Sequence, residues 1–343
     1  MGRKVGAMKK ILHYKKRSRY EDAPDPAQFV AQITNVDSAE VYQYPGGAEE
    51  KVLREISFDI RRGECWCLVG SEAFEIELLL EIIGSVRPYD KGRIILAERG
   101  MMRKKRRVLP HVFFISDSDV IYPNMNTLEY LMVATANMPG EAALRQAHIL
   151  QRLLDTGLYY LTLTPIKYLS RAQKAVISLL AASFTMSLLI IFSVPQLEFD
   201  SRLAKGIRGI TDIITKGGGA VLIGTKDLAM AQEAGTHAAF LISGRVTHSG
   251  SIQDVMAKLD KRVYIVTCDH PEAFAQKLKE LEPALHASVR GREVQVFDYR
   301  GTPIDQSGFL RLVEQTGEAV DTVMTSHKTL ENAYLEALSS HDL

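Results

Sequence analysis

A short segment near residue 70 has the pattern of a phosphate-binding loop, yet it carries several acidic side chains. Residues 68–80 read LVGSEAFEIELLL, in which an apolar run reaches Gly70, turns, and continues with the pattern of a helix. A strand, a glycine turn and a helix together direct backbone N–H groups toward an anion. Here Glu75 and Glu77 add negative charge, and at ~4 Å each would oppose a phosphate by on the order of 1 to 4 kcal/mol. The segment is therefore predicted to disfavour a bound triphosphate.

The segments around this turn alternate short apolar strands with helical patterns. Strands are expected at residues 52–60, 65–70, 92–98, 112–117, 188–194, 220–225 and 238–244. Interleaved strands and helices predict an α/β fold with a mainly parallel sheet that is covered on both faces. Ligands of such folds bind beyond the carboxyl ends of the strands, here near Gly70 and Ser193.

One uncharged segment is long enough to span a membrane. Residues 175–197 read AVISLLAASFTMSLLIIFSVPQL, and about 20 apolar residues suffice for a spanning helix. Serine and threonine dilute the segment, and its β-branched run ends at Pro195. This pattern favours a helix, a turn and a buried strand. The N-terminal residues lack the apolar run of a secretory signal.

The chain divides by pattern into three parts. Residues 1–29 are polar and basic, which predicts a flexible tail. Residues 30–260 form the large α/β part, with a helical stretch at about 122–187. From 261 to 343 the order β-α-β-β-α-β-α predicts a small α+β domain of the ferredoxin-like type with one added helix.

Overall charge does not indicate a nucleic-acid partner. The chain has 42 Lys and Arg against 41 Asp and Glu, a formal net charge of +1. A basic run at 99–107 has no interleaved aromatic residues and is expected to be an exposed loop. Three cysteines without metal-ligand spacing indicate a reducing, cytoplasmic setting.

The run from Val52 to Ile95 resembles the start of an ATP-binding-cassette (ABC) transporter ATPase subunit, and the register holds without a gap. The resemblance implies a P-loop NTPase-type ABC ATPase fold with a helical subdomain. The later glycines, the lysine and the serine of the family's Walker A motif fall on Ala73, Glu75, Ile76 and Glu77. A P-loop needs that lysine for the phosphates and that hydroxyl for Mg²⁺. Neither chemistry is available here.

The other motifs of the family can be placed in the same register. The Q-loop glutamine falls on Asp117, the Walker B Asp-Glu pair on Ser193 and Val194, and the switch histidine on Lys226. The signature glycines fall on Arg171 and Ala172. Six catalytic or Mg²⁺-linked positions are therefore lost: Ile76, Glu77, Asp117, Ser193, Val194 and Lys226. Five positions keep residue types that contact nucleotide in the family and are treated as vestigial: Tyr44, Gly70, Ser170, Gln173 and Asp200.

The resemblance implies a catalytically inactive subunit of an ABC transporter. The terminal run TLENAYLEAL resembles the SLEDVFL run of the drug and antibiotic exporter branch, which favours an exporter. Its partners would be a motif-complete ABC ATPase subunit, in a head-to-tail heterodimer, and transmembrane permease subunits. Its own site would require no cofactor, while ATP and Mg²⁺ would bind at the partner's site opposite Ser170 and Gln173. Such a subunit would lie in the cytoplasm, peripheral to the inner face of the membrane.

Two other functions remain open from the sequence. A stand-alone scaffold or regulator would keep the fold without transport or hydrolysis. An active enzyme with rewritten motifs would need other catalytic groups, but Asp200 and Asp227 lie too far along their loops to replace the Walker B pair. Nucleotide binding without hydrolysis is a further alternative, through Tyr44 and the loop backbone.

Overall fold

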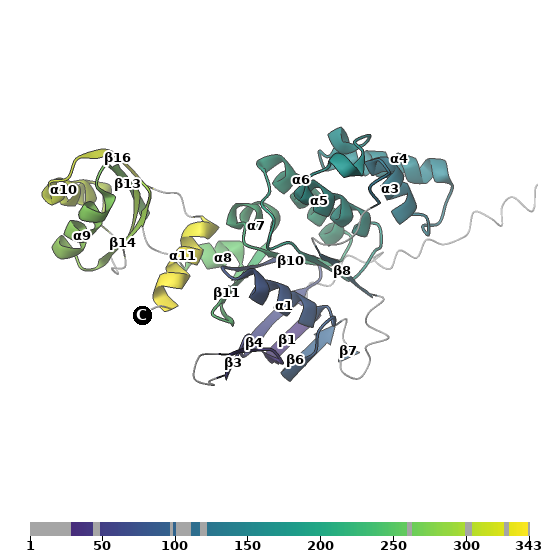
Figure 1. Cartoon of the computed structure of the whole chain (residues 1–343), viewed down its shortest axis with the longest axis horizontal. Coiled ribbons are helices and arrows are strands. Elements are labelled where there is room, and N and C mark those ends of the chain that lie inside the picture. The colour runs from purple at the N-terminus through teal and green to yellow at the C-terminus, as the bar shows by residue number, and fades with distance from the viewer. Residues whose placement is uncertain are drawn as a thin grey trace, which may run out of the picture.

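A computed structural model describes the backbone of residues 29–43, 49–96, 99–100, 111–116, 122–258, 263–298, 304–325 and 329–341 (Figure 1). Two candidate nucleotide-site residues, Tyr44 and Asp117, lie outside these ranges. The same is true of the predicted tail up to residue 28, and of the basic run except for the backbone of its first two residues.

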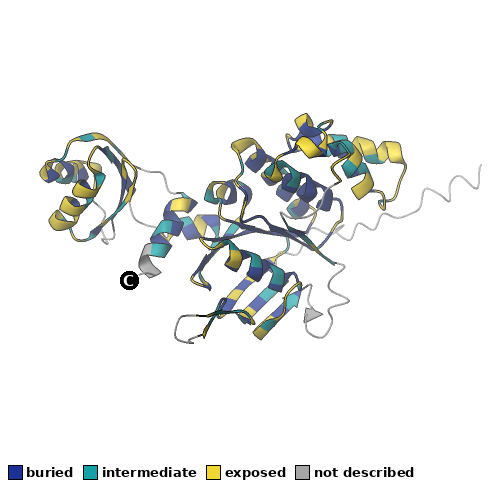
Figure 2. Cartoon of the chain, in the orientation of Figure 1, coloured by how far each residue is buried: buried dark blue, intermediate teal, exposed yellow. Residues whose placement is uncertain are grey.

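The centre of the large part is a six-stranded sheet in the order β12-β11-β5-β10-β9-β8. Its strands are β5 (Cys65–Gly70), β8 (Val112–Ser116), β9 (Leu189–Ser193), β10 (Ala220–Thr225), β11 (His237–Ile242) and β12 (Arg245–Ser251). Neighbours are parallel except for β11 and β12. Every residue of β5, β9 and β10 is buried, which Figure 2 shows as dark blue strands. Alternate side chains of these strands enter separate hydrophobic clusters on the two faces, as expected for a sheet covered on both sides.

A second, antiparallel sheet accompanies the mainly parallel one. It has the order β4-β1-β6-β7, and a separate β2-β3 pair lies outside it. The strands are β1 (Phe29–Ser38), β2 (Val41–Gln43), β3 (Glu49–Lys51), β4 (Ile56–Arg61), β6 (Tyr89–Leu96) and β7 (Arg99–Gly100). In β4 buried and exposed residues alternate strictly, the pattern of a strand with one solvated face. Helix α1 (Ala73–Ile83) shares a hydrophobic cluster with both sheets.

Helices cover the other face of the parallel sheet. They are α3 (Thr127–Ala134), α4 (Ala142–Asp155), α5 (Arg171–Ala182), α6 (Ser201–Lys216), α7 (Leu228–Ala234) and α8 (Ile252–Ala257), with short 3₁₀ turns at Tyr159–Leu161 and Ile166–Tyr168. The uncharged segment at 175–197 contains the end of α5, a turn and β9, as predicted. Within the described part of the chain, no helix combines the length and apolar character needed to cross a bilayer.

The C-terminal part folds around its own antiparallel sheet, in the order β14-β15-β13-β16. Its elements are β13 (Val263–Cys268), α9 (Pro271–Leu281), β14 (Leu285–Arg290), β15 (Glu293–Asp298), α10 (Gln306–Thr316) and β16 (Val320–Thr325). Tyr264 and Phe309 stack at the centre of its core, with ring centroids 3.8 Å apart. The element order and the strand order are those of a ferredoxin-like unit.

The last helix, α11 (Leu330–His341), returns to the large part of the molecule (Figure 1). Its buried residues belong to the cluster that lines the parallel sheet, and the Tyr334 ring meets the Phe240 ring of β11 edge-on at 5.2 Å. The Leu330 backbone N–H donates to Gln232 Oε1 of α7 at 2.7 Å. The sequence grouped this helix with the C-terminal part, whereas the apolar face of the helix is buried against α7, α8 and β11.

Candidate functional site

The parallel sheet brings several predicted positions to one edge. Strand β10 lies between β5 and β9, and Gly224 pairs with Leu68 on one side and Ser193 on the other. The carboxyl ends of these strands therefore place Gly70, Ser193 and Lys226 along the same edge. This is the edge at which α/β folds of this type bind ligands.

The connection from β5 to α1 is too short to wrap around a phosphate group. Only Ser71 and Glu72 separate Gly70 from Ala73, where the helix begins. The Ile76 N–H already donates to the Glu72 carbonyl at 3.3 Å. A phosphate cradle needs successive backbone N–H groups that converge on the anion, but here the amide at the family's lysine position is used within the helix.

Ile76 points into the core rather than toward the sheet edge. It is fully buried, and a Cβ atom added to Gly224 would come within 2.6 Å of Ile76 Cγ2. Because Gly224 has no side chain, α1 can approach β10 closely and the isoleucine fills the space between them. The position is therefore one of packing in this fold.

Glu75 is buried and held by hydrogen bonds away from the loop. Its side chain is 5% exposed. The Tyr42 hydroxyl donates to Oε1 at 3.2 Å, and the Gly244 N–H donates to Oε2 at 3.1 Å. Burial raises the pKa of the Glu75 carboxyl, while these two hydrogen bonds and the Arg54 charge oppose the rise. Glu75 therefore joins α1 to β2 and to the β11–β12 turn.

That turn has its own backbone requirement. Gly244 has φ of 72°, and a Cβ atom there would collide with the Val52 carbonyl oxygen. A glycine can adopt this conformation without strain. The N–H that binds Glu75 is therefore presented by a position that favours glycine.

The other two glutamates of the segment remain nearer to solvent. Glu72 is exposed and precedes the first helical residue, and Glu77 is partly exposed on α1. Carboxylates at the start of a helix interact favourably with its dipole, by about 0.3 to 1 kcal/mol each.

The positions of the Walker B pair and the switch histidine lack carboxylate and imidazole groups. Ser193 and Val194 are both buried, and the Val194 N–H donates to the Gly224 carbonyl at 2.9 Å. Lys226 is exposed just before α7. In the described residues, no three His, Cys, Asp or Glu side chains are grouped so as to hold a metal ion. Mg²⁺ requires hard oxygen ligands, commonly carboxylates, in a near-octahedral arrangement.

The remaining candidate residues cap helices. Ser170 Oγ accepts from the Gln173 N–H at 3.1 Å, and Gln173 Oε1 accepts from the Ser170 N–H at 2.9 Å. This reciprocal pair forms a capping box at the start of α5. Asp200 accepts from the Leu203 N–H at 2.8 Å and caps α6. These residues therefore cap α5 and α6, two helices that do not follow the Gly70 loop.

Tyr334 of α11 lies beside the short loop. Burial raises the pKa of its phenol, the neighbouring Ser71 opposes that rise, and the charges of Glu75 and Glu72 add to it. The Tyr334 hydroxyl oxygen is buried and makes no hydrogen bond to the described residues. Sequence analysis missed both Tyr334 and Tyr42 as neighbours of the loop. Tyr42 lies two residues before the predicted Tyr44 in the run YQY, but no local signal indicates the position of Tyr334.

Comparisons with known proteins bear on the class of this protein. No family model matches the sequence. An Fe(3+) ions import ATP-binding protein of Haemophilus influenzae is 27% identical over 164 residues, which are 47% of this chain and 46% of that protein. The mouse ABC-type organic anion transporter ABCA8B is 24% identical over 305 residues, 84% of this chain and 18% of its own. The chain spans 46% to 60% of the length of this iron import protein and of two further ABC transporter ATP-binding proteins that it matches, the molybdate/tungstate import protein WtpC of Pyrococcus horikoshii and the energy-coupling factor protein EcfA2 of Methanospirillum hungatei.

A solved structure of an ATP-binding subunit of an ABC transporter superposes with a TM-score of 0.53 at 18% identity. The superposed residues make up 67% of this chain and 92% of the solved chain. The chain therefore has the fold of an ABC ATPase cassette, as the sequence predicted, with a small α+β part after it. Its sequence relatives and structural neighbours are ABC transporter ATP-binding proteins.

Proposed function

We propose that this chain is a catalytically inactive ATP-binding-cassette subunit of an ABC transporter. It pairs with a motif-complete ATPase subunit and couples that subunit's nucleotide cycle to transmembrane permease subunits. In this proposal the chain lies on the cytoplasmic face of the membrane through its partners. Its own Walker A position holds no nucleotide.

The observation that carries the proposal is the two-residue connection between β5 and α1. Helix α1 starts at Ala73, and the side chain at the family's lysine position is buried against β10. A triphosphate would have to displace a packed helical turn before any backbone amide could reach it. This displacement adds to the charge repulsion from Glu72 and Glu77, the two glutamates that lie nearer to solvent.

The lost carboxylate pair supports the absence of hydrolysis. In phosphoryl transfer, acidic side chains hold the metal and a further group orients the attacking water. Ser193 and Val194 offer neither group, and Val194 belongs to the core. Lys226 cannot accept a hydrogen bond near a γ-phosphate.

The C-terminal part supports an exporter. The terminal run TLENAYLEAL, which forms most of α11, resembles the terminal run of the drug and antibiotic exporter branch.

Affinity purification of the tagged chain from native membranes tests the proposal. A second ATPase subunit and a permease should be recovered with it, and the complex should hydrolyse ATP. Replacing the Walker A lysine of the partner ATPase should abolish hydrolysis, whereas Ser193→Ala in this chain should leave the rate unchanged.

Two results would contradict the proposal. Hydrolysis by the isolated chain that is lost on Ser193→Ala would make the chain an enzyme with rewritten motifs. Recovery of the chain without any membrane subunit or second ATPase would instead support a stand-alone scaffold.

A further inference from the structure

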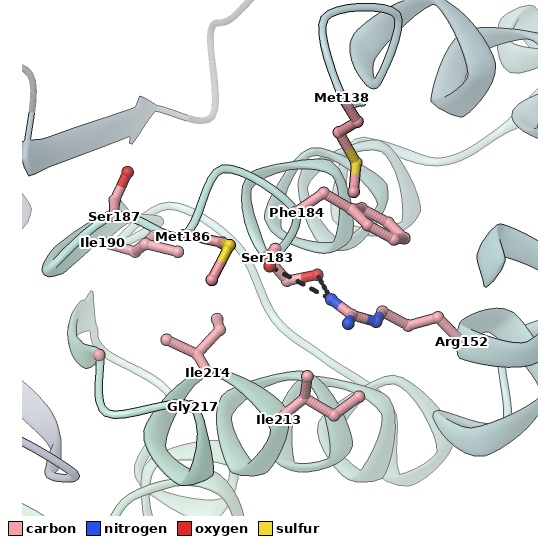
Figure 3. Close-up of a pocket in the computed structure, with 11 residues that line it drawn as sticks. Met138, Arg152, Ser183, Phe184, Met186, Ser187, Ile190, Ile213, Ile214 and Gly217 are labelled. Carbon is pink, nitrogen blue, oxygen red and sulfur yellow. Dashed lines mark hydrogen bonds between the residues drawn. The ribbon is translucent and has the colours of Figure 1, made fainter. Parts of the chain in front are cut away.

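A cavity lies at the other edge of the parallel sheet, away from Gly70. It opens between α4, the connection from α5 to β9 and the end of α6, and has a volume of about 290 Å³ (Figure 3). Ile190 is the second residue of β9, and Gly219 comes just before β10. The cavity therefore adjoins the amino ends of the strands and is separate from the nucleotide-like edge.

The wall of the cavity is mainly apolar. The side chains that supply this surface are Met138, Phe184, Met186, Ile190, Ile213 and Ile214. Methionine side chains adapt readily to the shape of a bound molecule. Small-molecule sites in proteins are commonly concave and apolar, with a few polar groups that fix the orientation of the ligand.

Arg152 is the one charged residue among those that line the cavity. Its Nη1 donates to the carbonyl oxygen of Ser183 at 3.2 Å and to the Ser183 hydroxyl at 3.0 Å. The guanidinium also lies over the Phe184 ring, 4.4 Å from its centroid. These contacts hold the group at the margin of the cavity, as Figure 3 shows.

Among the residues that the structure describes, Arg152 has no ion-pair partner. Over the part of the chain that the structure describes, no carboxylate lies within ion-pair distance of the guanidinium, and its Nε and Nη2 donate to no protein group. Burial lowers the pKa of this guanidinium, with only a partial offset from Asp155. A half-buried cation beside an apolar cavity gains from an anionic partner.

We propose that this cavity binds a small amphiphilic carboxylate, with the carboxylate at Arg152 and an apolar chain between the methionine and isoleucine side chains. A water molecule occupies about 30 Å³ in the liquid. The cavity volume of about 290 Å³ therefore has room for a ligand of on the order of ten non-hydrogen atoms. A planar guanidinium whose remaining donors bind no described protein group matches the geometry of a carboxylate. The bound ligand would link α4 to α6, and this inference does not depend on the proposed function.

Titration with octanoate, followed by NMR of ¹³C-methyl-labelled methionines, tests the site in the full chain. The Met138 and Met186 methyl signals should shift in a saturable manner, with a Kd below about 1 mM. The Met230 signal should not move, because that side chain is a buried part of α7 and does not line the cavity. Acetate tests the head group alone, octylamine reverses its charge, and neither should reproduce the shifts.

Arg152→Gln should weaken octanoate binding at least tenfold. Arg145→Gln removes the same charge from the same helix but does not line the cavity, so it should leave the affinity unchanged. Ile213→Trp keeps the guanidinium and fills the cavity, and it should also abolish the shifts. If Arg152→Gln fails to fold, Ile213→Trp still tests whether octanoate binds in the cavity.

Three results would overturn the proposal. The first is an absence of shifts up to 10 mM octanoate. The second is equal binding of octylamine, and the third is unchanged octanoate affinity in Ile213→Trp.

Discussion

Glu75 and Ile76 are neighbours in α1, but their side chains lie in different surroundings. Glu75 is hydrogen-bonded to Tyr42 and Gly244 at the start of the helix, and Ile76 packs against the sheet. Both occupy positions that bind nucleotide in the family that the sequence resembles. In this fold each has a structural role that can be measured without nucleotide.

Glu75→Gln should change the pH dependence of stability. The pKa of Glu75 is raised in the folded state, chiefly by burial. The folded protein therefore binds this proton more tightly than the unfolded chain does, so the contribution of Glu75 to stability is fully present below its ordinary pKa. That contribution is lost as pH rises from about 4.5 through the raised folded pKa. Relative to Glu75→Gln, the unfolding free energy of the wild type should fall over this range.

Urea unfolding at several pH values between 4 and 8 measures this difference. Glu72→Gln is the matched control, since this glutamate is exposed one turn earlier. An identical pH dependence for Glu75→Gln and the wild type would show that Glu75 titrates normally in the folded state.

Ile76→Lys should destabilise the protein rather than restore nucleotide binding. The side chain is fully buried and faces Gly224. An uncompensated buried charge costs on the order of 3 to 5 kcal/mol. Ile76→Leu nearly conserves volume and should cost less than about 1.5 kcal/mol. Denaturant unfolding compares the variants, and wild-type stability of Ile76→Lys with newly acquired ATP binding would refute the packing role.

At the scale of elements, α11 packs on α7, α8 and β11 and brings Tyr334 beside the short loop between β5 and α1. Helix α1 begins only two residues after that strand ends. The helix is joined to the large part by the Gln232 hydrogen bond, and to the C-terminal sheet by the ion pair of Arg290 with Glu331 at 2.5 Å. The far C-terminus of the described chain thus contributes to the surroundings of the loop.

Tyr334→Ala should loosen both α11 and the loop. Removal of a buried aromatic ring typically costs about 3 to 5 kcal/mol, and part of this cost should appear as local opening at Ser71. Hydrogen exchange of peptides that contain residues 70–73 should accelerate by roughly tenfold or more, which corresponds to 1.4 kcal/mol.

Tyr334→Phe is the control for this prediction. It keeps the edge-on contact with Phe240 and removes only the hydroxyl beside Ser71. Exchange of the loop should then stay close to that of the wild type. If Tyr334→Ala accelerates exchange in α11 alone, the helix and the loop are not coupled.

At the scale of the whole molecule, the start of α5 should lie opposite the nucleotide of the partner ATPase subunit in the proposed transporter complex. Ser170 already caps α5 through Gln173. Asp and Asn cap helices about as well as Ser, so either residue can replace Ser170 with little loss of stability.

Ser170→Asp should lower ATP hydrolysis of the purified complex by roughly tenfold or more. A carboxylate at ~4 Å from a phosphate costs on the order of 1 to 4 kcal/mol. Ser170→Asn keeps the cap without the charge and should retain most of the activity. Steady-state hydrolysis by complexes of equal composition measures the effect, and equal rates for the two variants would place Ser170 away from the partner's phosphates.

Much of the fold could be predicted because its signals are local. Fully apolar runs such as CWCLVG predicted buried strands, and the change to helical spacing after them predicted the layers of an α/β fold. The strict alternation in ISFDIR is also a local signal, of a half-exposed antiparallel strand, but it does not indicate which strands are its neighbours. Sheet membership depends on pairing between distant segments, here β1 with β4 and β6.

The sequence by itself determined which chemical groups this protein lacks at the family's positions: no lysine at Ile76 and no paired carboxylates at Ser193 and Val194. Side-chain identity requires no knowledge of the fold. Only the tertiary structure decided that Glu75 binds Tyr42 and Gly244, that α11 covers the loop, and that Arg152 lies at an apolar cavity. Each of these contacts joins residues far apart in the chain, and their positions are determined by the packing of whole elements rather than by local pattern.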